Sequence, residues 1–403
     1  MNLRHASLFS QLLQHFPRTE FSQLVGKHQA ERGAKGFTCW TQFVAMLFCH
    51  LARADSLREI CNGMACCLGK LAHLGVWRAP NKSTLAYANE HRPAALYEDL
   101  FWTVLGRMRK SGGLGACKKR FRFKNKLLSL DSTTITLSLS LFDWAAFRRA
   151  KGGVKVHVLL DHDDYMPQWV AIRNAREHDR QGARLLSLRP GSIVAMDRAY
   201  NDYGLFGRWT RQGVYFVTRQ KSNAAYDVVE DRPVPKRGHV LSDQIIRFTA
   251  AAAHEKCPFA LRRVVVWDEA NATEIVLLTN HLSFGPTTIS AIYKDRWEIE
   301  VFFKALKQNL KIKTFVGTSE NALRIQVWTA LIALVLLRWL HYLSHASWSL
   351  SNQAAMLRMN LFTYRDLRAW LRAPFGQPTG PFPPEIGVQL EIPLPGLGQP
   401  TSA

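Results

Sequence analysis

Two aspartates follow short apolar runs that have the composition of buried strands. Asp131 comes directly after LLSL, and Asp197 comes directly after SIVAM. A carboxylate at the end of a strand projects into the crevice along the edge of a sheet, where active sites are common. Because a single such aspartate more often begins an ordinary turn, a third acid is needed before a catalytic site is inferred.

The third acid lies in the segment AIYKDRWEIEVFFKALKQNLKIKTF. Its polar residues Tyr293, Arg296, Glu300 and Lys307 are spaced by three, four and seven residues. A helix turns by ~100° per residue, so this spacing predicts that all four project from one helix face. A helix face that carries an acid, two cations and a phenol is too polar to pack in the hydrophobic core. Its cations indicate a phosphate group nearby.

Two aspartates and a glutamate form an oxygen-rich ligand set of the kind that hard divalent cations prefer. Two such ions held ~3.5–4 Å apart activate an attacking oxygen and stabilise a leaving one. The chemistry that this arrangement suits is in-line displacement at a phosphodiester, in which metals and cationic side chains carry the developing charge.

These residues resemble the DDE transposases of bacterial insertion sequences, in particular the IS-four type with its Tyr-x2-Arg-x3-Glu-x6-Lys signature. The four residues from Tyr293 to Lys307 match every spacing of that signature, and the LDSTTI and MDRAYNDY blocks are similar to the first and second aspartate motifs. KVHVLLD followed by NAREHD resembles the strand pair that follows the first aspartate. The resemblance covers roughly residues 1 to 370 and leaves out the proline-rich tail.

The resemblance implies an α/β fold: an RNase H-like catalytic domain with a β-rich insertion, preceded by an all-helical DNA-binding region. It implies that Asp131, Asp197 and Glu300 are catalytic and bind Mg²⁺, with Mn²⁺ as a substitute. Tyr293, Arg296 and Lys307 would hold phosphates of the transposon end. The implied activity is cut-and-paste transposition on terminal inverted repeats, with two protomers of a homodimer in the synaptic complex.

The chain divides by pattern into four parts. We expect a helical DNA-binding region over residues 1–100 and a basic linker over 101–126. A catalytic domain is expected over 127–345, with its β-rich insertion at about 210–285. A C-terminal helical segment with a Pro/Gly-rich tail is expected over 346–403. The segment NKSTLAYANEHRP predicts a short helix with Ser83 as its N-cap, ending before Pro93. Either a recognition helix or a solvated amphipathic helix fits it.

The charge of the chain is strongly positive. Its 53 Lys and Arg residues exceed its 31 Asp and Glu residues by 22. Such a surface favours a polyanionic partner. Nine of the basic residues fall between Gly106 and Lys126 with no acid among them, so we expect this segment to approach a phosphate backbone of double-stranded DNA.

Composition also excludes several classes of protein. With 47% hydrophobic and 21% charged residues the chain is expected to fold as a soluble globular protein rather than a disordered one. The apolar stretch from Val327 to Leu337 is shorter than a membrane span and is expected to be a buried core helix. Seven irregularly spaced cysteines and the lack of a secretory pattern predict reduced thiols in a bacterial cytoplasm.

Other polar residues near these motifs are interpreted as structural. Asp161, Asp163 and Asp164 in the loop DHDDYMP are expected to be turn acids, and His178 and Asp179 are left out of the catalytic set. Two tryptophans, Trp267 and Trp297, are candidates for stacking an extruded base, although most of the twelve must lie in the core.

Two other functions remain open at this level. A metal-dependent nuclease or resolvase would use the same acids without joining strands. A DNA-binding repressor of transposition would need no acids at all, so the three intact acids argue against it.

Overall fold

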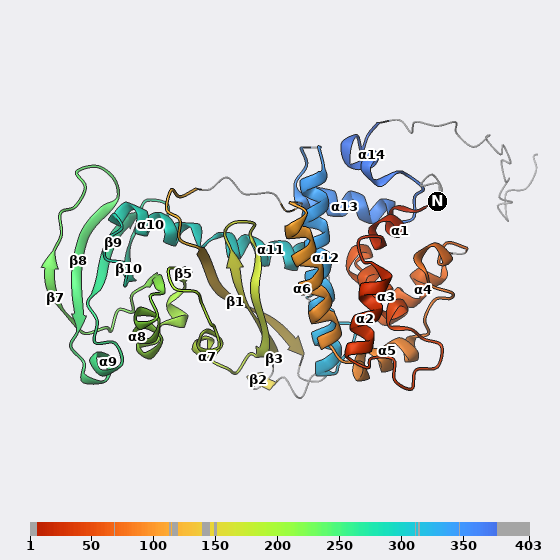
Figure 1. Ribbon diagram of the computed structural model, residues 1–403, viewed down its shortest axis with the longest axis horizontal. Helices are drawn as coiled ribbons and strands as arrows, with labels where there is room; N and C mark the ends of the chain where they lie inside the picture. The colour runs from red at the N-terminus through yellow and green to blue at the C-terminus, as the bar shows by residue number, and fades with distance from the viewer. Residues whose placement is uncertain are drawn as a thin grey trace, which may run out of the picture.

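The computed structural model describes residues 6–376, apart from 68, 113, 115–119, 139–145, 149–150, 311, 313–314 and 346. Helices gather at one end of an elongated molecule and a large twisted sheet forms the other end, with two long helices between them (Figure 1). Cys117 and the proline-rich tail from residue 377 onward lie outside the described residues.

The helical part draws its elements from both ends of the chain. Ser7, Thr38 and Ser56 begin three of its helices by accepting a hydrogen bond from the backbone N–H three residues further on, which satisfies an otherwise unpaired donor of the first turn. The elements are α1 (Leu8–Leu13), α2 (Arg18–Lys27), α3 (Cys39–Ala52), α4 (Leu57–Ala65), the 3-10 helix η2 (Ala72–Leu74), α5 (Lys82–His91), α6 (Ala95–Lys110), α12 (Glu320–Leu343), α13 (Leu350–Asn360) and α14 (Leu367–Arg372).

The core of this part is α12. The helix is long and apolar enough to cross a membrane by length and composition, yet 83% of its apolar window is buried inside the protein. It contacts α3, α5 and α6, and the stretch from Val327 to Leu337 is buried throughout, as predicted for a core helix. A buried hydrogen bond joins Thr329 Oγ1 of α12 to His50 Nε2 of α3 at 3.0 Å. Although α12 falls within the expected catalytic region 127–345, it packs mainly among the N-terminal helices.

The short helix α5 differs in detail from its sequence prediction. Its N-cap is Asn81 rather than Ser83, and it ends at His91, two residues before Pro93. Asn89 is buried, where it accepts a hydrogen bond from Gln42 at 2.8 Å. Part of the polar face is therefore structural.

A mixed ten-stranded sheet forms the other end of the molecule, in the order β2-β3-β1-β5-β6-β10-β9-β8-β7, with β4 on β3. β3 runs antiparallel to both of its neighbours, β1 and β4, whereas β5 runs parallel to β1 and β6 runs parallel to β5. The strands are β1 (Leu127–Ser138), β2 (Ala146–Arg148), β3 (Lys151–Asp161), β4 (Met166–Asn174), β5 (Ile193–Met196), β6 (Tyr215–Arg219), β7 (Tyr226–Asp231), β8 (Val240–Phe248), β9 (Leu261–Asp268) and β10 (Thr273–Thr279).

This architecture confirms the predicted fold class, an RNase H-like α/β domain preceded by helices. The predicted β-rich insertion is present as β7 to β10, and it continues the central sheet through pairing of β10 with β6. A buried ion pair across this extension joins Arg262 of β9 to Asp243 of β8, with nitrogen and oxygen 2.6 Å apart.

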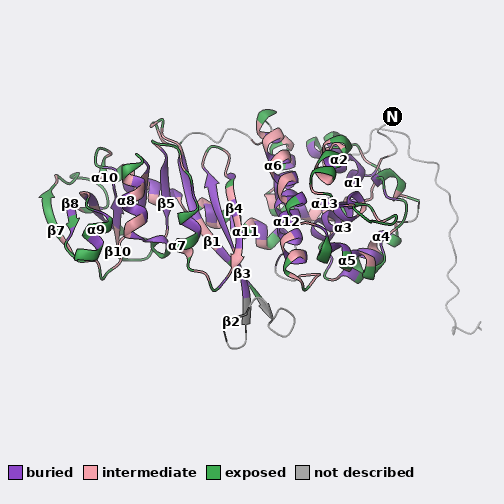
Figure 2. Ribbon diagram, turned by 60° about the horizontal axis from the view of Figure 1, so that its bottom comes forward, coloured by how far each residue is buried: buried purple, intermediate pink, exposed green. Residues whose placement is uncertain are grey.

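Helices cover both faces of the sheet (Figures 1 and 2). The apolar residues of α8, α9 and the inner strands form one buried cluster, whereas α10 and α11 contribute to clusters on the opposite face. The helices of the two faces are α7 (Asp179–Arg184), α8 (Tyr203–Arg211) and α9 (Ala251–Lys256), and then α10 (Pro286–Asp295) and α11 (Glu298–Asn309). The 3-10 helix η4 (Arg198–Tyr200) follows β5.

The basic segment is anchored by acids of the sheet part. The predicted boundary at residue 100 falls inside α6, which continues to Lys110. Arg109 at the end of α6 donates to Asp164 at 2.6 Å, and Lys126 pairs with Asp161 at 2.6 Å and also with Asp163. Asp163 and Asp164 lie in the turn, as expected, whereas Asp161 is the last residue of β3. Together the three acids pair with two of the nine cations.

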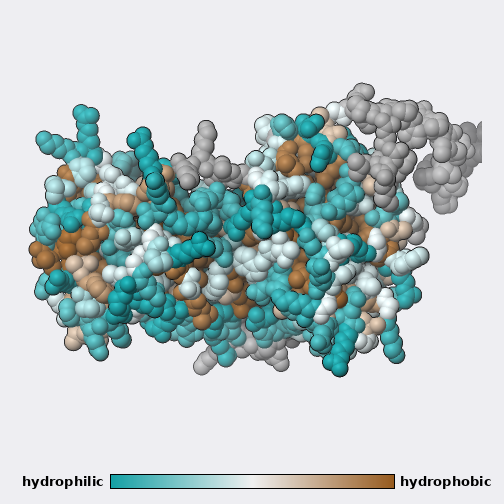
Figure 3. Space-filling model, viewed as in Figure 1, coloured by the Kyte–Doolittle hydropathy of each residue, from teal (hydrophilic) through white to brown (hydrophobic). Residues whose placement is uncertain are grey.

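Hydrophilic side chains dominate the surface seen in Figure 3, and a hydrophobic patch lies at the far end of the sheet, over β7. Val228 and Val229 of that edge strand are exposed.

Gly207 in α8 lies so close to α9 that a Cβ there would meet the carbonyl oxygen of Lys256 at 2.1 Å. We expect Gly207→Ala to lower the free energy of unfolding by about 1–3 kcal/mol, because the two helices must separate. Gly106→Ala in α6 is the matched control: a Cβ there meets nothing within 4 Å, so the better helix propensity should raise stability by about 0.5–1 kcal/mol. Urea unfolding of both variants measures this, and equal effects would contradict the packing argument.

Candidate active site

Register places the two predicted aspartates side by side. In the parallel pairing of β1 with β5, the last aligned residues are Leu130 and Met196. Asp131 and Asp197 are the next residues after this aligned pair. They therefore occupy neighbouring positions at the carboxyl edge of the two strands, which lie about 4.8 Å apart.

The strand that carries Asp131 is longer than the sequence predicted. The strand does not end at LLSL: β1 continues to Ser138, paired only with β3 beyond Leu130. Asp131 therefore lies within a strand, at the point where β1 loses its parallel neighbour. Asp197 does follow the last residue of β5.

The predicted signature helix is two helices. Arg296 and Trp297 lie between α10 and α11, and bonds such as Glu300 N–H to Trp297 O, at 2.9 Å, tighten the chain there into a 3-10-like turn. The backbone of both residues stays right-handed helical. The shared face is kept, since Arg296 still reaches Glu300 four residues on.

Arg296 links two of the three acids. Its guanidinium lies 3.1 Å from Asp131 Oδ2 and 2.8 Å from Glu300 Oε1. The Arg296 side chain is only 13% exposed, and its buried Nε has no hydrogen-bond partner. A buried cation with one unused donor thus stands between a carboxylate of the sheet and a carboxylate of α11.

Burial and crowding of negative charge perturb Asp131. Burial raises the pKa of Asp131, the Ser132 backbone N–H and Arg296 oppose the rise, and Asp197 and Glu300 add to it, so that the pKa is about 6. Both other acids are therefore near enough to Asp131 to influence its charge. Among the residues that the structure describes, no three His, Cys, Asp or Glu side chains already form a metal-binding group.

Tyr293 and Lys307 border the same site. The Tyr293 ring lies 5.5 Å from the Arg296 guanidinium carbon and is half-buried against the sheet, and burial raises its pKa. Lys307 Nζ lies 3.4 Å from the carbonyl oxygen of Thr134 on β1. Tyr293 therefore lies beside Arg296, and Lys307 contacts β1 three residues beyond Asp131.

A polar network that sequence reasoning left out supports this edge from the other face. Ser132 Oγ donates to Asp179 Oδ1 at 2.8 Å, and Lys155 Nζ pairs with the same oxygen at 3.1 Å. His157, opposite Ser132 in the β1–β3 register, lies 3.1 Å from the Tyr200 hydroxyl. Burial lowers the pKa of His157 to about 4, so it is neutral at pH 7. The sequence signal was the HD pair of NAREHD, of which only Asp179 enters the network.

Both candidate stacking tryptophans are exposed. Trp267 of β9 is 40% exposed, and Trp297 at the junction of α10 and α11 is 61% exposed. Trp297 adjoins Arg296 in sequence and is the nearer of the two to the acids along the chain.

Comparison with known proteins gives two family matches. Residues 122–336 match the transposase DDE domain, and residues 4–77 match a domain of unknown function, DUF4372. The first match spans Asp131, Asp197 and the whole Tyr-Arg-Glu-Lys signature.

Relatives are named as transposases. The chain is 33% identical over 300 residues to y4zB of Sinorhizobium fredii, which covers 73% of this chain and 82% of that protein. It is 32% identical over 226 residues to the transposase of insertion sequence element IS5377 of Geobacillus stearothermophilus. This match covers 56% of this chain and 59% of that protein. Among solved structures, a piggyBac transposase synaptic complex with hairpin DNA matches with a TM-score of 0.43 and 11% identity, over 91% of this chain and 82% of that chain.

The raised pKa of Asp131 predicts a pH-dependent stability. Between its ordinary value of 3.8 and about 6 the folded protein binds the proton more tightly than the unfolded chain, so this group lowers stability as pH rises through that window. Asp131→Asn should therefore gain about 1–3 kcal/mol relative to wild type between pH 4 and pH 7. Urea unfolding at both pH values measures it, with Glu298→Gln as the control expected to change by no more than about 0.5 kcal/mol. A pH-independent difference for Asp131→Asn would refute the assignment.

Proposed function

Since the chain belongs to the DDE transposase family and is thus a DNA transposase, an enzyme that cleaves and joins DNA, we propose that Asp131, Asp197 and Glu300 are its catalytic acids. The observation that carries this proposal is the register of β1 and β5, which places two acids at one sheet edge, opposite a third acid on α11. All three positions lie within residues 122–336, which match the transposase DDE domain.

The DNA transposase depends on a divalent metal, and we propose Mg²⁺, with Mn²⁺ as a substitute. The donor set fits such an ion, since carboxylate oxygens are its preferred ligands and the single positive charge of Arg296 leaves the negative charge of Asp131 and Glu300 only partly compensated. When bound, the ions activate the attacking oxygen and stabilise the leaving oxygen. Asp131, Asp197 and Glu300 would hold them.

Arg296 has a further role in this proposal. Its guanidinium pairs with both Asp131 and Glu300 in the structure described here, so metal binding would release one or both contacts. The freed donors, together with the unused Nε, would then bind a phosphate of the transposon end, beside the Tyr293 hydroxyl and the Lys307 ammonium. Arg296 would thereby exchange a carboxylate partner for a phosphate partner.

Other parts of the chain would recognise the DNA. We propose that the N-terminal helical region binds the terminal inverted repeats and that exposed cations of the basic segment follow the phosphate backbone. Lys110, Arg122 and Lys124 are exposed, whereas Arg120 is paired with the buried Asp295. This leaves part of the segment available for DNA.

The biological setting follows from the activity. We propose cut-and-paste movement of an insertion sequence in a bacterial cytoplasm, with a homodimer holding two ends in synapsis. A nuclease or resolvase would share the acids but leave only free ends, and a non-catalytic repressor would bind the repeats without cutting them. The products of the reaction distinguish all three.

The decisive experiment uses a labelled DNA fragment that carries the repeats flanking the gene. Wild type with Mg²⁺ should cut at the repeat boundary and join the end to target DNA. Asp197→Ala and Glu300→Gln should each reduce joined product by roughly 10³-fold, while Glu298→Gln on the same helix retains activity. Resolution of products on denaturing and native gels shows both steps. Full strand transfer by Glu300→Gln would remove this residue from the site.

The proposed phosphate contact of Lys307 predicts a change in salt dependence. Lys307→Ala should weaken binding to transposon-end DNA and reduce the slope of log affinity against log salt by about 1. Lys304→Ala, an exposed lysine one turn earlier on α11, is the control and should leave the slope unchanged. Fluorescence anisotropy over a salt series measures both, and identical slopes for wild type and Lys307→Ala would exclude the contact.

A further inference from the structure

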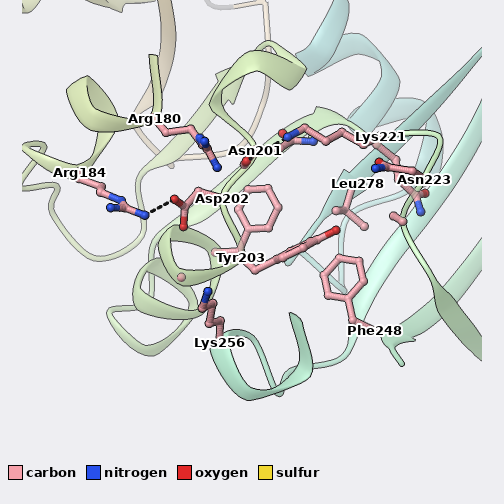
Figure 4. A pocket seen from close by; sticks show the side chains of 14 residues that line it. Arg180, Arg184, Asn201, Asp202, Tyr203, Lys221, Asn223, Phe248, Lys256 and Leu278 are labelled. Atoms are coloured by element: carbon pink, nitrogen blue, oxygen red, sulfur yellow. Dashed lines mark hydrogen bonds and ion pairs between the residues drawn. The ribbon is translucent and has the colours of Figure 1, made fainter. Parts of the chain in front are cut away.

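A cavity of about 380 Å³ opens on the opposite face of the sheet from Glu300. Figure 4 shows its lining, which comes from α7, the segment after η4, α8, the β6–β7 connection, β8, α9 and β10. Its volume is in the range of pockets that enclose small ligands, about 300–1,000 Å³. The cavity is therefore large enough for a single nucleotide and far too small for a DNA duplex.

The charge of this pocket is positive and largely uncompensated. Arg180, Arg184, Lys221 and Lys256 line it, against the single acid Asp202. Arg184 is already paired with Asp202, whereas no carboxylate within the described chain pairs with the other three cations. Three cations around one small cavity favour a phosphate group.

An aromatic wall accompanies these cations. Tyr203 lines the pocket at the start of α8, and its ring packs on Phe248 with centroids 4.6 Å apart. Phe248 is buried and Tyr203 only partly so, which leaves the tyrosine ring as the accessible surface. A nucleobase stacks on such a ring, because every base has a flat π-face.

Two short stretches of chain connect the wall of the pocket with the candidate active site. Asn201 of its wall is the fourth residue after Asp197 and is held by Thr218 Oγ1, 2.8 Å from its Oδ1. Arg180 directly follows Asp179, whose carboxylate accepts the Ser132 hydroxyl next to Asp131. The pocket wall is thus continuous along the chain with Asp197 and with the residue that supports Asp131 through Ser132.

We propose that this pocket binds one unpaired nucleotide of a DNA strand, with its phosphate on Arg180, Lys221 and Lys256 and its base against Tyr203. The proposal rests on the DNA transposase function and adds a binding site to it. The same chemistry would suit a free nucleoside monophosphate, but the link to the acids favours a nucleotide that is part of DNA.

Binding without metal tests the pocket apart from the chemistry. Full-length protein in EDTA is titrated with a labelled duplex that carries a short single-stranded overhang, and with a blunt duplex of equal length, by fluorescence anisotropy. Arg180→Gln combined with Lys256→Gln should weaken overhang binding by about tenfold or more and blunt binding by less than about threefold. Lys236→Gln, an exposed cation outside the pocket, should bind both as wild type does. Equal losses on the two DNAs, or no loss, would overturn the proposal.

The aromatic contact has its own readout. With 2-aminopurine in the overhang, wild type and Tyr203→Phe should quench its fluorescence by stacking, and Tyr203→Ala should not, with affinity about tenfold weaker. Quenching by Tyr203→Ala equal to wild type would exclude the stacking site. Competition by deoxynucleoside monophosphate as effective as the overhang DNA would assign the pocket to free nucleotides instead. Overhang binding through Tyr203 in a protein that forms no joined product would refute the transposition chemistry and leave the pocket standing.

Discussion

The parallel pairing of β1 with β5 is the constraint on which the site depends. Once Leu130 is aligned with Met196, the following residues Asp131 and Asp197 must lie next to each other, because the rise along two paired strands is the same. A shift of one residue would turn one aspartate to the opposite face of the sheet. The apolar residues before each aspartate prevent that shift, since they are buried between the two helical layers.

Placing acids together in this way creates an electrostatic problem that the protein solves with Arg296. The pKa of Asp131 rises to about 6, which shows that burial and neighbouring acids outweigh the stabilising contacts. The guanidinium between Asp131 and Glu300 limits this repulsion and holds α11 against the sheet edge. The same site that binds metal and DNA in the proposed reaction is thereby compatible with a folded protein before either arrives.

The two faces of the sheet contribute different residues to the surroundings of this edge. On one face, α10 and α11 bring the signature residues to the acids. On the other, Ser132, Lys155 and Asp179 form a hydrogen-bonded support, and the cationic pocket begins at the adjacent Arg180. Alternation of side chains along β1 explains this division, because Asp131 and Ser132 necessarily point to opposite faces.

Local sequence determined the residue types, the spacing of the signature and the buried character of α12, because helical periodicity and apolar runs are properties of short segments. The fold class followed from the resemblance of these motifs to those of the DDE transposases. Only the tertiary structure decided that β1 continues past Asp131, that the signature spans two helices joined at Arg296 and Trp297, and that Asp179 supports the site. Each of these depends on pairing between segments far apart in the chain, and neither strand length nor side-chain partners across a sheet are encoded in the residues of one segment alone.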